Sequence, residues 1–320
     1  MVAFKKHALS LDEQIHTLSA RGLVVTDPVR AKHYLKNISY FRLSAYTRPF
    51  YIPGSGDEHR FISGTSFDDV LRLYIFDREL RLLLLDAIER IEVALRAQLT
   101  QVLATRHGPH GYLDSNIFKS HYNHQWLISE LKSKSERREI EAFLKSYQQK
   151  YPDSPVQPPL WMALELLSFK QISELFANLR FPEDQKPLTK HFGFQFTVLK
   201  TWFHSLSDLR NHCAHHSRVW NREFGTSPVW PRKAPKNWIY VPEKIAVHSS
   251  PAQTINPRRR LYYQLVIIET LLSKVSPGSG WATRLNGLIS RNPAISRVHM
   301  GFPDNWEEEP LWILAGIQSK

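Results

Sequence analysis

The stretch SFDDVLRLYIFDRELRLLLLDAIERIEVALRAQL (residues 66–99) carries the strongest helical pattern in the chain. Its large apolar residues recur every three or four positions, which is the period of one face of an α-helix. They are Leu73, Phe76, Leu80, Leu84, Ile88, Ile91 and Leu95. Ser66 followed by Asp69 resembles a capping box, the usual start of a helix. The pattern therefore predicts one long helix from Ser66 to about Arg106.

The remaining segments are also typical of helices and loops. Short helices are expected after Ser10 and after Asp27, which is followed by Pro28 at the first helical position. Further helices are expected over residues 121–150, 160–179, 194 to about 222, 258–274 and 281–290, whereas FPEDQKP (181–187) is expected to form a turn. Residues 224–257 hold six prolines and predict a long loop. No segment shows a convincing strand pattern, so the sequence predicts an all-α fold with an N-terminal helical extension (1–60) and a helical domain (61–320).

Composition places the chain among globular, intracellular proteins. Hydrophobic residues make up 42% of its 320 residues, with nine Trp and seventeen Phe, enough for a sizeable core. A single cysteine excludes an internal disulfide and fits a reducing compartment. No apolar run reaches the length of a membrane span, and the N-terminus lacks the apolar centre of a signal peptide. We therefore expect a cytoplasmic protein with no membrane partner.

The charge of the chain is strongly positive and unevenly distributed. The formal net charge is +12, and residues 227–300 hold eleven Lys or Arg against two Asp or Glu, a local excess of nine. Such a basic stretch favours a polyanionic partner, most often a nucleic acid. A merely solvated basic surface is the alternative interpretation.

The stretch DLRNHCAHHSRVWNRE (residues 208–223) gathers three histidines, three arginines and the only cysteine. His212 and His216 stand four apart, a spacing at which two histidines on one helix can hold zinc. Only one cysteine is present, however, and no CxxC or HExxH motif accompanies the pair. Packing explains His212 and Cys213 better than metal ligation does, so we expect no metal and no cofactor.

Arg210, Asn211, His215 and His216 offer instead the groups that RNA cleavage requires. Attack by a 2′-hydroxyl needs a base that takes its proton and an acid for the 5′-oxygen, and histidine titrates nearest to neutral pH. Arginine offers two parallel donors to a phosphate. Residues five apart lie about 140° from each other on a straight helix, so one helix aims Arg210 and His215 poorly at one phosphate. A site shared by two subunits would remove this difficulty.

The same residues resemble the R-x4-6-H motif of HEPN-superfamily ribonucleases, in the form carried by the Abi-like abortive-infection family of the AbiD and AbiF type. The motif alone is a weak pattern. Four further blocks occur in the order of that family, so the resemblance covers most of the chain. They are NISYFRLSAYTRPF (37–50), LYIFDRELRLLLLDAIERIEVALRAQL (73–99), ELLSFKQISELFANL (165–179) and GFPDNWEEEPLW (301–312).

The resemblance implies an all-α HEPN-type helical bundle, metal-independent endoribonuclease chemistry and a composite active site in a homodimer. It also implies a bacterial anti-phage or toxin–antitoxin role, in some members restrained by a small regulatory RNA. Carried onto this chain, the motif assigns Arg210 as the arginine and Asn211 as its polar neighbour. His215, at the shortest spacing, or His216 is then the catalytic histidine, with His215 slightly favoured.

Charged residues elsewhere are candidates to support the site or to bind RNA. In HEPN folds the long helix packs beside the motif helix, so charged residues of the long helix can orient catalytic side chains. Ion pairs between residues four apart on the long helix account for most of these charged residues. The supporting candidates are Asp77, Arg81 and Glu92. The RNA-binding candidates are Arg42, which lies among aromatic residues that can stack on bases, Arg218, Arg222, Arg258, Arg259 and Arg260. Docking of the segment around Arg42 onto the core, and a solvated turn at 258–260, are the alternatives.

Two alternatives to an endoribonuclease stay open. The first is a non-catalytic protein that binds a small structured regulatory RNA, which the basic region 227–300 favours. The second is a nucleotidyltransferase partner or another transferase. Against it, the chain has no glycine-rich phosphate loop and no paired acidic metal site.

Overall fold

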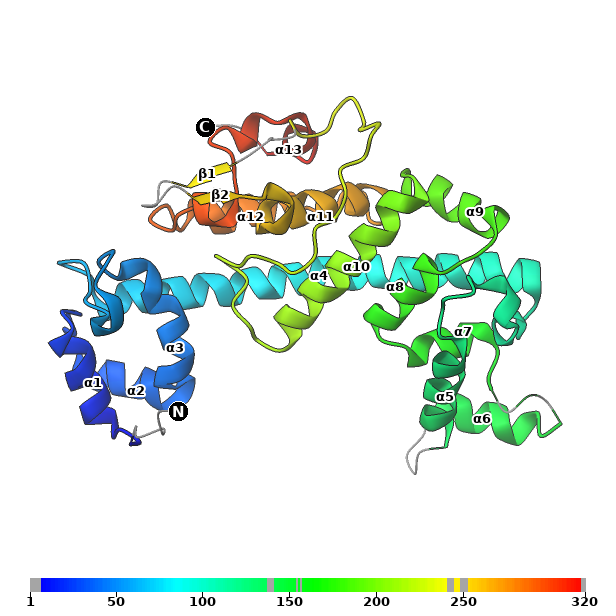
Figure 1. Ribbon diagram of the computed structural model, residues 1–320, viewed down its shortest axis with the longest axis horizontal. Helices are drawn as coiled ribbons and strands as arrows, with labels where there is room; N and C mark the ends of the chain where they lie inside the picture. Colours follow the sequence, from blue (N-terminus) through cyan, green and yellow to red (C-terminus); the bar gives the residue numbers. More distant parts are fainter. Residues whose placement is uncertain are drawn as a thin grey trace.

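One long helix forms the axis of the molecule, as the apolar period predicts. The computed structural model describes residues 7–136, 141–153, 155, 157–240, 245–247 and 253–317. In it, α4 (Phe67–His107) begins at a capping box between Ser66 and Asp69. It ends at Gly108, whose φ of +78° suits a residue without a Cβ. Figure 1 shows α4 running through the middle of the molecule.

Shorter helices surround α4. They are α1 (Leu11–Ala20), α2 (Pro28–Ile38), α3 (Tyr40–Thr47), α5 (His124–Ser135), α6 (Ala142–Lys150), α7 (Leu160–Ala163), α8 (Phe169–Ala177), α9 (Pro182–Phe192), α10 (Phe196–Ala214), α11 (Leu261–Val275), α12 (Trp281–Ser290) and α13 (Pro310–Leu314). In Figure 1, α1, α2 and α3 lie at one end of α4 and α5, α6 and α7 at the other, with α11 and α12 along one side. The all-α prediction is confirmed, and the predicted proline-rich loop adds one short antiparallel hairpin, β1 (Ile245–Val247) with β2 (Gln253–Ile255).

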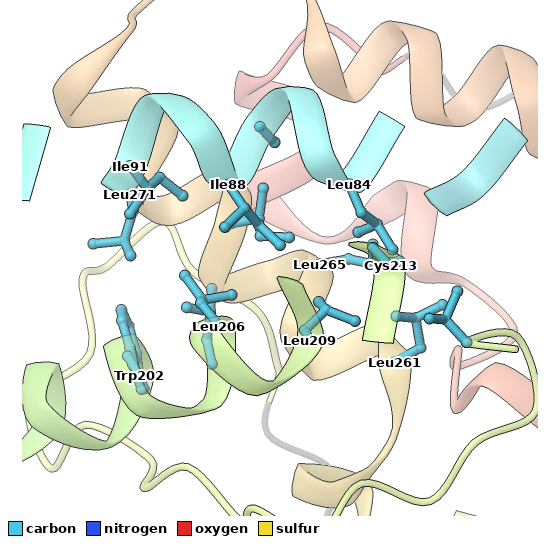
Figure 2. Packing of buried hydrophobic residues seen from close by; sticks show 14 of the residues in the cluster. Leu84, Ile88, Ile91, Trp202, Leu206, Leu209, Cys213, Leu261, Leu265 and Leu271 are labelled. Atoms are coloured by element: carbon cyan, nitrogen blue, oxygen red, sulfur yellow. The ribbon is translucent and has the colours of Figure 1, made fainter. Parts of the chain in front are cut away.

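The centre of the core lies where α10 and α11 pack on α4. Figure 2 shows the fully buried side chains that meet there: Leu84, Ile88 and Ile91 from α4, Trp202, Leu206, Leu209 and Cys213 from α10, and Leu261, Leu265 and Leu271 from α11. The apolar positions of α4 therefore face two neighbouring helices. This packing fixes α10 beside α4 and holds the end of α10, which carries the histidine-rich motif, against the core.

Several helix boundaries differ from the sequence prediction. The motif helix α10 ends at Ala214 rather than near Arg222. The predicted turn at 181–187 belongs to α9, because Pro182 at the first helical position and acidic residues in the first turn favour a helix start. The helix predicted over 160–179 is divided, since Ser168 caps α8 and separates it from α7. The helix predicted over 121–150 is α5 and α6, with residues 137–140 outside the described range.

The N-terminal helices dock against the start of α4. The Val24 N–H donates to the Thr65 carbonyl, and the Phe67 N–H donates to the Val24 carbonyl, both at 2.9 Å. Helix α3 packs directly on α4. Residues 39–48 thereby come close to the segment that follows α10. No helix in the described part of the chain combines the length and apolar character needed to cross a membrane.

Candidate active site

The motif helix ends in a sharp reversal at the histidine pair. The His216 N–H donates to the Cys213 carbonyl at 3.0 Å, and the Ser217 N–H donates to the His212 carbonyl at 2.9 Å. This is the pattern of a Schellman motif, in which glycine usually occupies the left-handed position. Here His216 occupies it, with a φ of +55°. Both histidines of the pair thus lie beyond the helix, and the geometry of a straight helix does not govern where they point.

A positively charged pocket lies between α3 and the segment that follows α10, and we call it the arginine pocket. Its volume is about 540 Å³, within the range of small-molecule binding sites. It is lined by Ser39, Phe41, Arg42, Ser44, Ala45, Tyr46, Arg48, His215, His216, Ser217, Arg218 and Arg222. No Asp or Glu is among the described residues that line it. Four arginines without a neutralising carboxylate attract anions to such a concave surface.

Hydrogen bonds between side chains and carbonyls join the two walls of the arginine pocket. Arg42 Nη1 donates to the His216 carbonyl at 2.8 Å, and Arg218 Nη1 donates to the Ala45 carbonyl at 2.9 Å. Arg222 Nε donates to the Arg218 carbonyl at 2.7 Å. Burial and the nearby Arg222 charge lower the pKa of Arg218. Arginine still remains protonated in proteins and carries five donors, so each guanidinium keeps donors for an anion.

Asp77, one of the supporting residues expected from the sequence, fixes this arrangement from beneath. Its carboxylate is fully buried. Oδ1 accepts from the Val219 N–H at 3.1 Å and from the Trp220 N–H at 2.7 Å. Oδ2 accepts from the Tyr46 hydroxyl at 2.7 Å and from Arg81. One carboxylate on α4 thus connects both walls of the arginine pocket, and Arg81 neutralises it.

Arg210 lies outside the arginine pocket, in a second hollow of about 460 Å³ beside α4. This hollow is lined by Leu85, Asp86, Glu89, Glu92, Val93, Arg96 and Arg210. Arg210 Nε is 3.8 Å from Glu92 Oε2, and Arg210 Nη1 donates to Asn211 Oδ1 at 3.5 Å. Glu92 also accepts from Arg96 Nη2 at 2.6 Å. Within one chain, the arginine and the histidines of the motif therefore line different hollows.

Cys213 packs inside the fold, and His212 is half-buried beside it. His212 Nε2 is 3.7 Å from Asp208 Oδ2, and its ring packs against Phe224. Burial and the Arg222 charge lower the pKa of His212. Burial, with the nearby Asp77 charge, raises the pKa of the Cys213 thiol to about 12, so the thiol is protonated at neutral pH and is a poor metal ligand. Among the described residues, no three His, Cys, Asp or Glu gather in a group that could hold a metal ion.

Two of the three arginines at 258–260 contact the chain itself through their side chains. Arg259 Nη1 is 2.9 Å from Glu223 Oε1, and Arg259 Nε donates to the Phe224 carbonyl at 2.8 Å. Arg260 is buried and donates from Nη1 to Asn221 Oδ1 at 3.2 Å. The Arg258 N–H binds the Asn256 side chain at the start of the turn. Arg259 and Arg260 thus support the segment after the arginine pocket.

A comparison with family models identifies the family of this chain. Residues 33–221 match the model of the Abi-like protein family. The chain belongs to the Abi-like family. The match extends from α2 to the residue before Arg222 of the arginine pocket and covers more than half of this Abi-like chain. Membership suggests a role in abortive infection. Comparisons with curated proteins and with solved structures give no match.

Arg48 is the pocket arginine that the sequence did not single out, and Phe41 was indicated only as one of the aromatic residues around Arg42. Arg48 and Phe41 stand seven positions apart, which places both on one face of α3 and its extension. Ser44 and Ala45, the small residues between them on this face, line the floor of the pocket. The sequence therefore does contain a signal for this wall of the pocket. It is an aromatic residue and an arginine two turns apart, with small residues between them on the same helix face.

Replacing His216 by glycine tests the left-handed backbone at this position. Glycine adopts a positive φ without the steric cost of about 1–2 kcal/mol that other residues bear. We expect the His216→Gly protein to have a free energy of unfolding about 1 kcal/mol above that of His216→Ala, measured by urea denaturation. At His215, whose φ is −86°, the order should reverse, with alanine more stable than glycine. An equal effect of glycine and alanine at position 216 would contradict the assigned backbone.

Proposed function

We propose that this protein is a metal-independent HEPN endoribonuclease of a bacterial abortive-infection or toxin–antitoxin system. The observation that carries the proposal is the arginine pocket, in which the exposed His215 and His216 lie together with four arginines at the end of the motif helix. Histidine supplies proton transfer near neutral pH, and arginine supplies charge for a phosphate. Membership of the Abi-like family agrees with this combination.

In the proposed reaction the substrate 2′-oxygen attacks the adjacent phosphorus. One histidine takes the 2′-hydroxyl proton, the bond from phosphorus to the 5′-oxygen breaks, and an acid protonates the departing 5′-oxygen. The products are a 2′,3′-cyclic phosphate and a 5′-hydroxyl, so no water or oxidant is consumed in this step. Arg210 stabilises the charge on the pentavalent phosphorus, and Asn211 positions Arg210 by the hydrogen bond described above.

The placement of Arg210 supports a site that is shared between two subunits. Its side chain is 37% exposed, whereas its partner Glu92 is 9% exposed. Arg210 and the histidine pair line different hollows in one chain. A second copy with its motif beside the first would bring its Arg210 to the histidine pair of the first chain, and the reverse. We therefore propose a homodimer with a composite site, in which Arg42, Arg48, Arg218 and Arg222 hold the RNA backbone.

The test is incubation of the purified full-length protein with RNA of mixed sequence in EDTA. We expect cleavage that persists in the chelator and leaves 2′,3′-cyclic phosphate and 5′-hydroxyl ends. The control is the Arg210→Ala/His215→Ala/His216→Ala protein, which should be inactive. Equal cleavage by that variant would refute the assigned site.

Tight RNA binding with steep salt dependence but no products would instead favour the alternative of a non-catalytic protein that holds a small regulatory RNA. The arginine pocket serves that function equally well, since four arginines contact phosphates in either case. The two functions therefore differ in their products and not in their affinity.

A further inference from the structure

Phe41 is a large apolar side chain with no cover. It is 88% exposed, more than any other large hydrophobic residue in the described part of the chain, yet it lines a pocket that holds four arginines. Burial of a phenylalanine contributes roughly 1.5–3 kcal/mol to stability, and this one contributes almost none of that to the fold. Such a residue at the edge of an anion site suits a partner with both an apolar face and negative charge.

A nucleotide has both properties. From this we infer that Phe41 stacks on an unpaired base of the RNA whose phosphate is held by Arg48, Arg218 and Arg222. The inference rests on the proposed function for its substrate and adds the residue that selects an unstacked nucleotide. A base within a continuous duplex has both faces occupied by its neighbours and cannot stack on a protein ring.

The geometry of α3 supports base stacking by Phe41 and phosphate binding by Arg48. Phe41 and Arg48 stand two turns apart, roughly 10 Å along the helix axis at 1.5 Å per residue. Ser44 and Ala45 leave the surface between them open. Ser39 caps α3 by accepting from the Arg42 N–H, so the positive end of the helix dipole also lies at the Phe41 end of the pocket.

Hydrogen bonds within the protein hold the two walls of the pocket together. Arg42 holds the His216 carbonyl, and Arg218 holds the Ala45 carbonyl, so the wall that carries Phe41 is fixed against the wall that carries the histidines. A base stacked on Phe41 is then positioned relative to the histidine pair by the protein backbone. Phe41 therefore acts as a positioning residue for the proposed reaction.

The experiment measures binding by fluorescence anisotropy in EDTA, with a labelled RNA dodecamer whose 2′-hydroxyls are methylated to prevent cleavage. The same strand is used alone and in a blunt duplex. We expect Phe41→Ala to weaken single-strand binding at least about fivefold and to leave duplex binding unchanged, while Phe41→Trp retains the wild-type preference. The matched control is Trp161→Ala, which removes an exposed aromatic residue on α7 and should change neither affinity.

Unchanged single-strand binding by Phe41→Ala would overturn the inference. So would a loss of the dimer in light scattering, because Phe41 would then be a contact between two copies of the chain. These outcomes are separate from the test of catalysis. If the wild-type protein binds the strand through Phe41 but cleaves no RNA, only the proposed enzymatic activity fails.

Discussion

Removal of both motif histidines is expected to reduce the rate of RNA cleavage by a factor of about 100 to 10,000, the usual contribution of a general acid–base pair. His215→Ala combined with His216→Gly is the cleanest form of this variant, because glycine at position 216 avoids adding backbone strain. Initial rates on a fluorescent RNA should fall, while RNA affinity stays close to that of the wild type since the four arginines remain. Of the two single variants, we expect His215→Ala to lose more activity, in keeping with the shortest motif spacing.

Mixing inactive variants tests whether two subunits share the site. The Arg210→Ala protein and the double-histidine variant should each be inactive alone. After joint refolding, mixed dimers hold one intact arginine and one intact histidine pair, and measurable cleavage should return. If no activity returns although mixed dimers form, the composite site is wrong. Activity in the double-histidine protein alone would exclude the pair from proton transfer.

Loss of the Asp77 carboxylate should have the largest effect on stability. In Asp77→Ala the Val219 and Trp220 N–H groups and the Tyr46 hydroxyl lose their acceptor, and Arg81 is left as a buried charge without its partner. Breaking a buried ion pair in this way costs about 3–5 kcal/mol, which urea denaturation should report as a loss in the free energy of unfolding. RNA cleavage by the folded fraction should also fall, because both walls of the arginine pocket depend on this carboxylate.

Asp86 on the same helix is the matched control. It pairs with Arg90 at 2.9 Å and with Arg284 at 2.6 Å, but its side chain is 35% exposed. Exposed ion pairs contribute about 0–1 kcal/mol, so Asp86→Ala should change stability little. Similar losses from both variants would mean that the contacts of Asp77 carry no special weight. Asp77→Asn preserves the shape of the side chain. We expect its free energy of unfolding to lie between those of the wild type and Asp77→Ala.

The long helix was predictable because its signals are local. The apolar period that includes Leu84 and Ile88 involves residues three or four positions apart. The capping box likewise joins Ser66 and Asp69, which are three positions apart. The packing role of Cys213 was also expected, because further metal-binding motifs are absent from the sequence, and Cys213 is buried. These features need no knowledge of distant contacts.

The reversal after Ala214 was not predictable in the same way. Nothing in the sequence marks His216 as a left-handed residue, because glycine is the usual residue at that position. The conformation is held instead by Arg42, which is 174 residues away, and by Asp77 through Val219 and Trp220. For the same reason the sequence did not indicate that Arg48 lies near the histidine pair. Contacts between distant segments made the arginine pocket, and local patterns carry no information on them.

The hydrogen bond between Arg42 and the His216 carbonyl has a consequence for the synthesis of the protein. A growing polypeptide that has left the ribosome with residues 39–48 but without residues 215–222 has only one wall of the arginine pocket. Contacts between such distant segments are intrinsically slow to form. The nuclease proposed above would therefore stay inactive throughout most of its own translation and would spare the messenger RNA that encodes it.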